Sequence, residues 1–435
     1  MDPATERIKA LLAGLTNYER SRPNAIRWSL DTMHALLRRP GARLPAGRLV
    51  QVGGSKGKGS TTAFLEALGA RAGLRVGGYY SPHVSTILER VRLQERNVDE
   101  ARLRTALLPV LDHVRALGVP ATFFEVMTAA AVQILAEADV ELGALEVGIG
   151  GRLDATTAVP VDAAIVTVVE LEHTQLLGGT VEAIAGEKAH VLRPGRPGFT
   201  AVQGPALAVL EAHAARVGAR LHVLGRDFAV EGVRAAQGGF AGVIRDPLGA
   251  RLPFALPRAP RFLVPALALA VACLRTLHPG LELALDPAPC TSLPGRFEVL
   301  DSASDSPWVL DGAHTEGSLQ ALAAGLGEGF PGSRAQVLFA SAADKRWREG
   351  LSALLPIADS FLVTGLTETS GEDPVEIVAW LRSRGARADT VRDAVEGVAR
   401  MRRRPGLRVV TGSFYLVGAA RAALGEAGSP STKHP

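Results

Sequence analysis

The fold is decided by the stretch VGGSKGKGS at residues 52–60, which stands between two patterned segments. Residues 49–52 form an apolar run typical of a short buried strand, and residues 61–68 have the composition of a helix. A glycine-rich turn between a strand and a helix lets backbone N–H groups approach a polyphosphate at the positive end of the helix. Lys58 can reach phosphate oxygens, and the Ser60 hydroxyl can bind Mg²⁺. The stretch therefore predicts a nucleotide-binding loop.

The loop departs from the general P-loop pattern, in which Ser or Thr directly follows the lysine. Here Gly59 stands between Lys58 and Ser60. The alternative is a tight strand-to-helix turn that binds no ligand. Residues 53–59 hold four glycines and two lysines. This is a costly way to make a plain turn, because glycine loses more conformational freedom on folding than any other residue. We therefore favour the ligand-binding interpretation.

Length and composition describe a soluble globular protein with more than one domain. The chain has 435 residues, so two or three domains are expected. Its longest apolar run, residues 262–274, is about half the length that a bilayer span requires. The N-terminus has no apolar signal core, and Cys273 and Cys290 are too few for a disulfide framework or a zinc cluster. We expect a cytoplasmic protein, acting as a monomer without a membrane partner.

The charge balance favours small anionic ligands. The 48 Lys and Arg residues exceed the 44 Asp and Glu residues, which gives a formal net charge of +4. No basic stripe carries interleaved aromatic residues, so we expect no nucleic-acid partner. A mild positive bias suits anions such as nucleotides.

The first part of the chain alternates apolar strand-like runs with helical patterns, which indicates a parallel sheet covered on both faces. The expected strands are residues 49–52, 74–77, 142–147 and 163–169. Residues 122–137 carry apolar side chains at helical spacing. Residues 201–258 alternate short β-like pieces with glycine turns, and we expect a small antiparallel appendage there. A buried helix is expected at residues 267–277.

A second α/β unit follows a linker expected at residues 293–298. Its expected strands are residues 308–310, 336–339, 360–363 and 407–410. Helices rich in Ala and Leu lie between them, as in a compact Rossmann-like domain. We place the first domain at residues 1–292 and the second at residues 296–428, and we expect a frayed tail beyond.

Three segments could complete a site around the glycine loop, because each lies at the end of an apolar strand or close to one. Glu146 ends an expected strand and, as a hard oxygen donor, suits Mg²⁺. His173 follows another expected strand, and Lys188 follows the helical residues 181–185. Each of these residues, taken singly, is usually structural or exposed. Their shared location at one edge of a sheet favours a functional role.

The second unit offers Asp311 and His314, directly after the expected strand at residues 308–310. A carboxylate and an imidazole at such a turn can face a cleft between domains, where small molecules often bind. An N-cap aspartate with a surface histidine explains these two residues equally well on local evidence.

In order along the chain, these segments resemble the folylpolyglutamate synthase/dihydrofolate synthase family of the Mur ligase superfamily. The resemblance covers nearly the whole chain. It rests on GSKGKGS at 54–60, SPH at 81–83, FFEVMT at 123–128, LEVGIGGRLDAT at 145–156, EHT at 172–174, EKA at 187–189, PGR at 294–296, DGAH at 311–314, TGS at 411–413 and YLV at 415–417.

The resemblance implies an α/β protein with an N-terminal P-loop-type parallel-sheet ATPase domain, its small antiparallel β appendage, and a smaller Rossmann-like C-terminal domain. It also implies an ATP-dependent amide ligase that uses Mg²⁺. In this family ATP phosphorylates the carboxylate of a folate or dihydropteroate, and the amine of L-glutamate then attacks the acyl phosphate. These small molecules would be the partners of the chain.

The resemblance also assigns a role to each candidate residue. The catalytic residues would be Lys58, Lys188, Asp311 and His314. The nucleotide would bind Gly54, Ser55, Lys56, Gly57, Lys58, Gly59, Ser60, Thr61, Arg296 and Asp311. The metal ions would bind Ser60, Glu146, His173 and Lys188, and Lys188 falls where the family carries a carbamylated lysine. The substrates would contact Ser81, His83, Phe124, Arg152 and Asp154.

Several departures from the family pattern keep other functions open. Ser55 and Lys56 replace Thr and Asn, and Glu172 replaces Asp. Residues 260–265 lack the Gln and Asn that help the family hold the nucleotide, and residues 89–97 replace its acceptor turn. One alternative is therefore a paralog that joins another carboxylate and amine. Another is a protein that binds nucleotide or folate without ligating.

Overall fold

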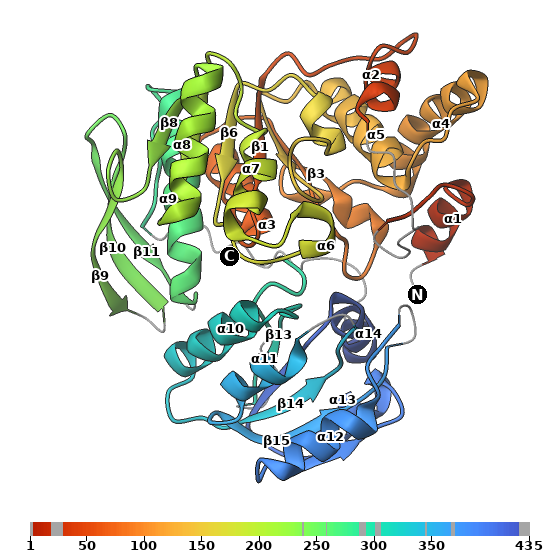
Figure 1. Cartoon of the computed structure of the whole chain (residues 1–435), viewed down its shortest axis with the longest axis vertical. Coiled ribbons are helices and arrows are strands. Elements are labelled where there is room, and N and C mark those ends of the chain that lie inside the picture. Colours follow the sequence, from red (N-terminus) through yellow and green to blue (C-terminus); the bar gives the residue numbers. More distant parts are fainter. Residues whose placement is uncertain are drawn as a thin grey trace.

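The computed structural model describes residues 3–18, 29–236, 239–257, 259–286, 293–300, 306–343, 346–366 and 370–425. Two α/β bodies lie one above the other, and the small sheet β9–β11 lies beside the first (Figure 1). Cys290 and the tail after residue 428 lie outside the described residues. Among the helices that are described, none has both the length and the apolar character to cross a bilayer.

The first body is built on an eight-stranded sheet with the order β4-β3-β2-β5-β1-β6-β7-β8. Its parallel strands are β1 (Arg48–Gly53), β2 (Val76–Tyr79), β5 (Leu142–Glu146), β6 (Ala163–Val166), β7 (Pro197–Thr200) and β8 (Arg220–Val223). Two short antiparallel strands, β3 (Val91–Leu93) and β4 (Arg96–Asn97), form one edge. The expected parallel sheet is confirmed. Two boundaries differ, because β2 begins at Val76 and β6 already ends at Val166.

Helices cover both faces of this sheet, as the sequence predicts. On one face, α3 (Lys58–Arg71) packs against α9 (Val264–Leu277) over alternate apolar side chains of β1. The other face carries two groups of helices. They are α2 (Asp31–Leu37), α4 (Glu100–Leu117) and α5 (Phe123–Glu137), then α7 (Val181–Ala189) and α8 (Pro205–Val217). Helix α5 begins where the sequence places it, because Thr122 and Glu125 form a capping box. The short helices of this body are α1 (Pro3–Leu11), η1 (Ile87–Arg90), η2 (Ala155–Ala158), α6 (Thr174–Leu177) and η3 (Arg261–Leu263).

The expected antiparallel appendage at residues 201–258 is only partly right. Residues 205–217 form α8, and β8 then joins the main sheet in parallel with β7. Helix α8 buries Ala206, Leu210 and Ala214, and this spacing of four residues is helical. The appendage itself is the three-stranded sheet of β9 (Ala229–Ala236), β10 (Gly239–Arg245) and β11 (Arg251–Leu256), whose apolar side chains pack on α9.

The second body has a six-stranded sheet with the order β12-β13-β17-β14-β15-β16. Its parallel strands are β13 (Trp308–Leu310), β14 (Ala335–Phe339), β15 (Ala358–Val363), β16 (Ala388–Thr390) and β17 (Leu407–Thr411), and β12 (Glu298–Leu300) is antiparallel. Helices α10 (Glu316–Gly329), α11 (Trp347–Leu354) and α12 (Pro374–Ser383) cover one face, and α13 (Ala394–Arg402) and α14 (Phe414–Leu424) cover the other. The expected Rossmann-like unit is confirmed. The short edge strands β12 and β16 were not expected.

Candidate active site

The glycine loop, residues 53–57, connects β1 to α3 at the carboxyl end of the parallel strands. Gly54 has a φ of 133° and Gly57 a φ of 80°, both in the region that favours glycine. A Cβ atom at position 54 would lie 1.9 Å from Oγ1 of Thr167, so only glycine fits there. Lys58 is the first residue of α3, and its Nζ donates a hydrogen bond back to the Gly54 carbonyl at 3.0 Å.

Glu146 lies beside this loop because it is the last residue of β5 and pairs with Val52 of β1. The side chain is buried, and its Oε2 accepts a hydrogen bond of 3.0 Å from the backbone N–H of Ser81. Burial raises the pKa of Glu146, and the charges of Arg296 and Lys58 oppose that rise. A buried carboxylate among cations is a suitable ligand for a hard divalent ion.

Lys188 reaches the same loop from α7. Its Nζ is buried and donates to the Gly54 carbonyl at 3.0 Å and to Oε1 of Glu172 at 2.8 Å. Burial lowers the pKa of Lys188, although the carboxylate of Glu172 opposes this. Burial alone would raise the pKa of Glu172, but Lys58 and Lys188 hold it below its usual range. Lys58 and Lys188 therefore both bind the Gly54 carbonyl, and Glu172 pairs with Lys188.

Of the predicted metal-binding residues, Lys188 contacts this loop and Glu146 ends the neighbouring strand. Ser60 is buried in the first turn of α3, whereas His173 precedes α6 on a segment that continues well beyond β6. The expectation that His173 lies at a strand end is therefore wrong, since β6 stops at Val166. Within the part of the chain that is described, no three His, Cys, Asp or Glu side chains are grouped to hold a metal ion. The predicted set has only two such residues and stays a prediction.

Arg296 makes a contact between the second body and the end of the glycine loop. A Cβ atom at Gly59 would lie 2.7 Å from Nε of Arg296, so the guanidinium packs directly on the first turn of α3. Its Nη2 donates to the Ser81 carbonyl at 3.4 Å, and its Cζ lies 5.2 Å from the centre of the Phe414 ring. The charge of the guanidinium also opposes the rise that burial causes in the pKa of Glu146, so the two bodies interact electrostatically here.

Asp311 and His314 lie in the segment between β13 and α10. Both oxygens of Asp311 accept backbone hydrogen bonds, 2.7 Å from Phe297 and 2.8 Å from Ala313. Burial raises the pKa of Asp311 to about 6. Nδ1 of His314 lies 2.7 Å from the Gly312 carbonyl, which fixes this nitrogen as the hydrogen-bond donor. Asp311 thus holds the turn that carries His314.

Of the predicted substrate-binding residues, Ser81 contacts Glu146 directly, and His83 and Phe124 pack on other side chains. Ser81 bonds Glu146 through its N–H and Arg296 through its carbonyl. Nδ1 of His83 accepts a hydrogen bond of 2.8 Å from the buried Nε of Arg90. The Phe124 ring packs against Tyr79 with a centroid separation of 5.7 Å, and it closely approaches Gly148.

Arg152 and Asp154 hold local structure in addition to any role toward a substrate. Oδ2 of Asp154 accepts the N–H groups of Gly148 and Ile149, and Oδ1 accepts the N–H and the hydroxyl of Thr156. The carboxylate therefore shapes the glycine-rich turn after β5. Arg152 is exposed and forms an ion pair of 3.0 Å with Glu187.

Three residues that complete this arrangement were not among the predicted site residues. Glu172 pairs with Lys188, Arg90 orients His83, and Oγ1 of Thr167 donates to the Lys56 carbonyl at 2.6 Å. Thr167 directly follows β6 at the edge where the site lies, so its position along the chain was an available signal. Arg90 had no local signal, because only the tertiary structure buries it beside His83.

Three features make the loop suitable for binding a polyphosphate. Two positive-φ glycines let the backbone approach a ligand closely, and Lys58 and Lys188 bring positive charge to it. The buried hydroxyl of Thr61, in the first turn of α3, also has no hydrogen-bond partner among the described residues. The carboxylate, hydroxyl and imidazole groups nearby are of the types that bind divalent ions as ligands.

Comparison with known proteins agrees with this geometry. Residues 295–414 match the family described as "Mur ligase, glutamate ligase domain". The chain is 30% identical to a dihydrofolate synthase/folylpolyglutamate synthase of Escherichia coli over 94% of each chain. It is 35% identical, over 86% of its own length, to a probable bifunctional folylpolyglutamate synthase/dihydropteroate synthase of Halobacterium salinarum. The chain spans about half the length of that relative, namely 46%.

Solved structures show the same fold over almost the whole chain. An Escherichia coli FolC in complex with DHPP and ADP superposes with a TM-score of 0.82 at 26% identity, covering 98% of each chain. A bifunctional folylpolyglutamate synthase/dihydrofolate synthase of Yersinia pestis, complexed with AMPPNP and a Mn ion, gives 0.80 at 28% identity, again over 98% of each chain. The chain belongs to the folylpolyglutamate synthase/dihydrofolate synthase family of Mur ligases.

Proposed function

We propose that the chain is an ATP-dependent amide ligase that adds L-glutamate to the carboxylate of a folate or dihydropteroate. One observation carries the proposal: Lys58, Lys188, Glu146 and Arg296 come from four separate segments and converge on one glycine loop. The relatives with that named activity, and the neighbours bound to ADP, AMPPNP and Mn, support it.

The residues around the loop suit phosphoryl transfer to a carboxylate. Lys58 and Arg296 place positive charge where the transferring phosphoryl group would need neutralisation. Ser60, Glu146 and His173 would bind Mg²⁺, which neutralises phosphate charge when bound. The contact of the two bodies through Arg296 would place an amine in line with the activated carboxylate. His314 and Asp311, which belong to the second body, would lie on the side of the site opposite the glycine loop.

Lys188 is suited to carbamylation, which the family resemblance implies. The reaction joins a neutral amine to CO₂ and releases a proton, so a lowered pKa favours it. Burial lowers the pKa of Lys188, while Glu172 holds the Nζ in place. The added carboxylate would then supply a metal ligand at the glycine loop.

Phosphate release with ATP, Mg²⁺ and L-glutamate tests the proposal. Dihydropteroate and tetrahydrofolate are supplied in separate reactions, and the product is identified by mass spectrometry. We expect glutamylated product with at least one acceptor, and loss of activity in Lys58→Ala and Lys188→Ala. No product with either acceptor, from a chain that binds both nucleotide and acceptor, would refute ligase activity toward folates.

A second candidate is a protein that binds nucleotide or folate without turnover. The observation in its favour is the segment before α9, where Phe262 packs edge-on against Phe297 at 5.8 Å and no amide side chain stands. Calorimetry separates the two candidates, because this one predicts binding of ATP or folate with no phosphate release. A third candidate joins another carboxylate and amine, and a panel of acceptor acids would reveal it. Cytoplasmic location and a monomeric state stay predictions.

A further inference from the structure

The glycine loop is fastened to the segment that follows β6. Oγ1 of Thr167 donates to the Lys56 carbonyl at 2.6 Å, and the backbone N–H of Ser55 donates to the Val168 carbonyl at 2.7 Å. The Ser55 hydroxyl in turn accepts the N–H of Glu170 at 3.0 Å. The backbone of Glu170 is therefore fixed relative to the loop, even when its side chain moves.

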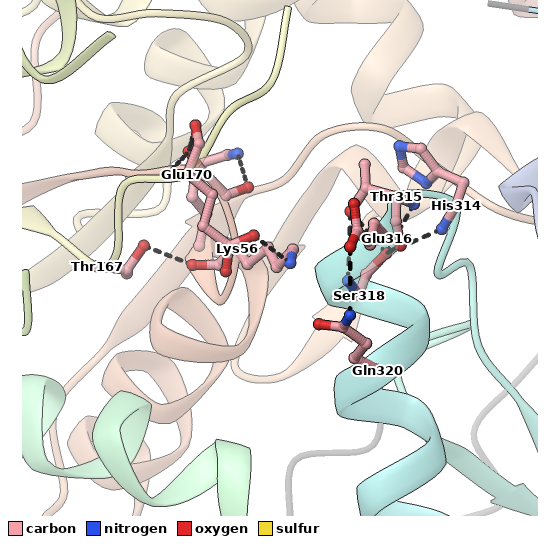
Figure 2. A network of polar contacts seen from close by, with 10 residues as sticks. Lys56, Thr167, Glu170, His314, Thr315, Glu316, Ser318 and Gln320 are labelled. Atoms are coloured by element: carbon pink, nitrogen blue, oxygen red, sulfur yellow. Dashed lines mark hydrogen bonds and ion pairs between the residues drawn. The ribbon is translucent and has the colours of Figure 1, made fainter. Parts of the chain in front are cut away.

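The side chains of Lys56 and Glu170 form an ion pair at the surface between the two bodies. Lys56 is 26% exposed and Glu170 is 43% exposed. Figure 2 shows this pair opposite the start of α10, which carries Thr315, Glu316 and Ser318. The Lys56–Glu170 pair of the first body therefore faces the N-terminal end of α10 in the second body.

The contact leaves little room at position 317, the second residue of α10, where the chain has glycine. A Cβ atom there would lie 2.6 Å from Nζ of Lys56 and 3.0 Å from Oε2 of Glu170. Gly327, on the same helix, has nothing within 4 Å of its own Cβ position. Glycine at position 317 thus leaves room for the Lys56 and Glu170 side chains, which a Cβ atom there would crowd.

The first turn of α10 attracts anions. Its backbone N–H groups have no intrahelical acceptor, and the helix carries partial positive charge at this end. Thr315 caps the helix through the N–H of Ser318. A carboxylate placed against the backbone of Glu316 and Gly317 is therefore stabilised, whereas an ammonium group there is destabilised. Glu170 therefore stabilises the contact, and Lys56 partly cancels that effect while it neutralises Glu170.

We propose that Lys56, Glu170 and Gly317 form a nucleotide-responsive contact that docks α10 on the glycine loop. A bound polyphosphate offers Lys56 more negative charge than one carboxylate does, so Lys56 turns toward the phosphates. Glu170 then faces the first turn of α10 without its neutralising partner and binds it more strongly. Docking positions Asp311 and His314, which precede α10, over the loop. This inference rests on the proposed function only for nucleotide binding by the loop.

Hydrogen–deuterium exchange and calorimetry with AMPPNP and Mg²⁺ test this contact in the full chain. A Cβ atom at position 317 would crowd Oε2 of Glu170 and move this carboxylate away from the first turn of α10. Binding and docking are reciprocal, so Gly317→Ala should weaken AMPPNP binding by about fivefold, although residue 317 is outside the loop. Gly327→Ala is the matched control, and its affinity should equal that of the wild type. Nucleotide should slow exchange in the first turn of α10 in the wild type and in Lys56→Arg. It should not do so in Lys56→Met or Glu170→Gln.

Two results would overturn the inference. One is equal AMPPNP affinity in Gly317→Ala and Gly327→Ala, provided both keep the circular dichroism of the wild type. The other is undiminished protection of α10 in Glu170→Gln. If the wild type binds no AMPPNP, the proposed function fails instead. In that case exchange without nucleotide still tests the contact, because Gly317→Ala should speed exchange in the first turn of α10 and the control Gly327→Ala should not.

Discussion

The ion pair between Arg421 and Glu298 offers a quantitative test of how the second body holds the segment around Ser85 of the first body. Nη2 of Arg421, on α14, lies 2.8 Å from Oε1 of Glu298 on β12. The two side chains are only 11% and 6% exposed. Nη1 of the same arginine donates to the Ser85 hydroxyl at 2.9 Å, and Ser85 follows the segment that carries Ser81 and His83.

We expect Arg421→Met to lower the free energy of unfolding by about 3–5 kcal/mol. The reason is that Glu298 stays buried as an unpaired carboxylate, with the Gly295 N–H as its remaining donor. The double variant Arg421→Met/Glu298→Gln should regain part of that loss, because it removes the uncompensated charge. Arg400→Met is the control, since its partner pair with Glu396 is exposed, and it should cost about 0.5 kcal/mol or less.

Urea denaturation followed by tryptophan fluorescence measures these differences. Three of the four tryptophans, Trp308, Trp347 and Trp380, lie in the second body, where the pair is located. The measurement is made in a Trp28→Phe background, so that the signal reports on this body alone. A loss below about 1 kcal/mol in Arg421→Met would show that the pair behaves as an exposed one. Additive losses in the double variant would contradict the argument that the stranded carboxylate causes the cost.

Three further predictions follow from single contacts. Gly54→Ala should abolish AMPPNP binding in calorimetry, because its Cβ would meet Thr167, whereas Gly73→Ala, with a φ of 87° but open space, should bind normally. Burial raises the pKa of Asp311 from 3.8 to about 6, so the folded chain holds this proton more tightly than the unfolded chain. The unfolding free energy should therefore fall as the pH rises from about 4 to 6, and Asp311→Asn should remove up to about 3 kcal/mol of that fall in pH-dependent urea curves. Tyr80→Phe should cost about 1.5–3 kcal/mol in urea denaturation, because the Tyr80 hydroxyl donates a 2.6 Å hydrogen bond to the buried Glu66 carboxylate, and unchanged stability would contradict this.

Local patterns in the sequence were sufficient for the parallel sheet and for the loop at its carboxyl edge. Apolar runs define β1, β5 and β17 to within a residue or two, because buried parallel strands are apolar on both faces. The position of Glu146 followed from the same rule, since residues at the carboxyl ends of parallel strands meet at one edge. The start of α5 followed from its capping residues.

Tertiary structure decided what no local pattern encodes. The turn of the β3–β4 hairpin holds Gln94 and Glu95 at positive φ, and its support comes from Glu66 on α3, whose carboxylate accepts the Glu95 N–H. Helix α8 and strand β8 were assigned to the wrong unit, because short β-like pieces do not reveal which sheet they join.

The glycine loop and the sheet beneath it are encoded locally, since both depend on residues that are neighbours along the chain. The approach of Arg296 to Gly59 and of Lys56 to Gly317 depends on how the second body packs against the first. Such contacts join residues far apart in the sequence, and only the folded chain sets their distance. The physical reason is that backbone periodicity is local, whereas the position of a charge in a cleft is a property of the whole packed structure.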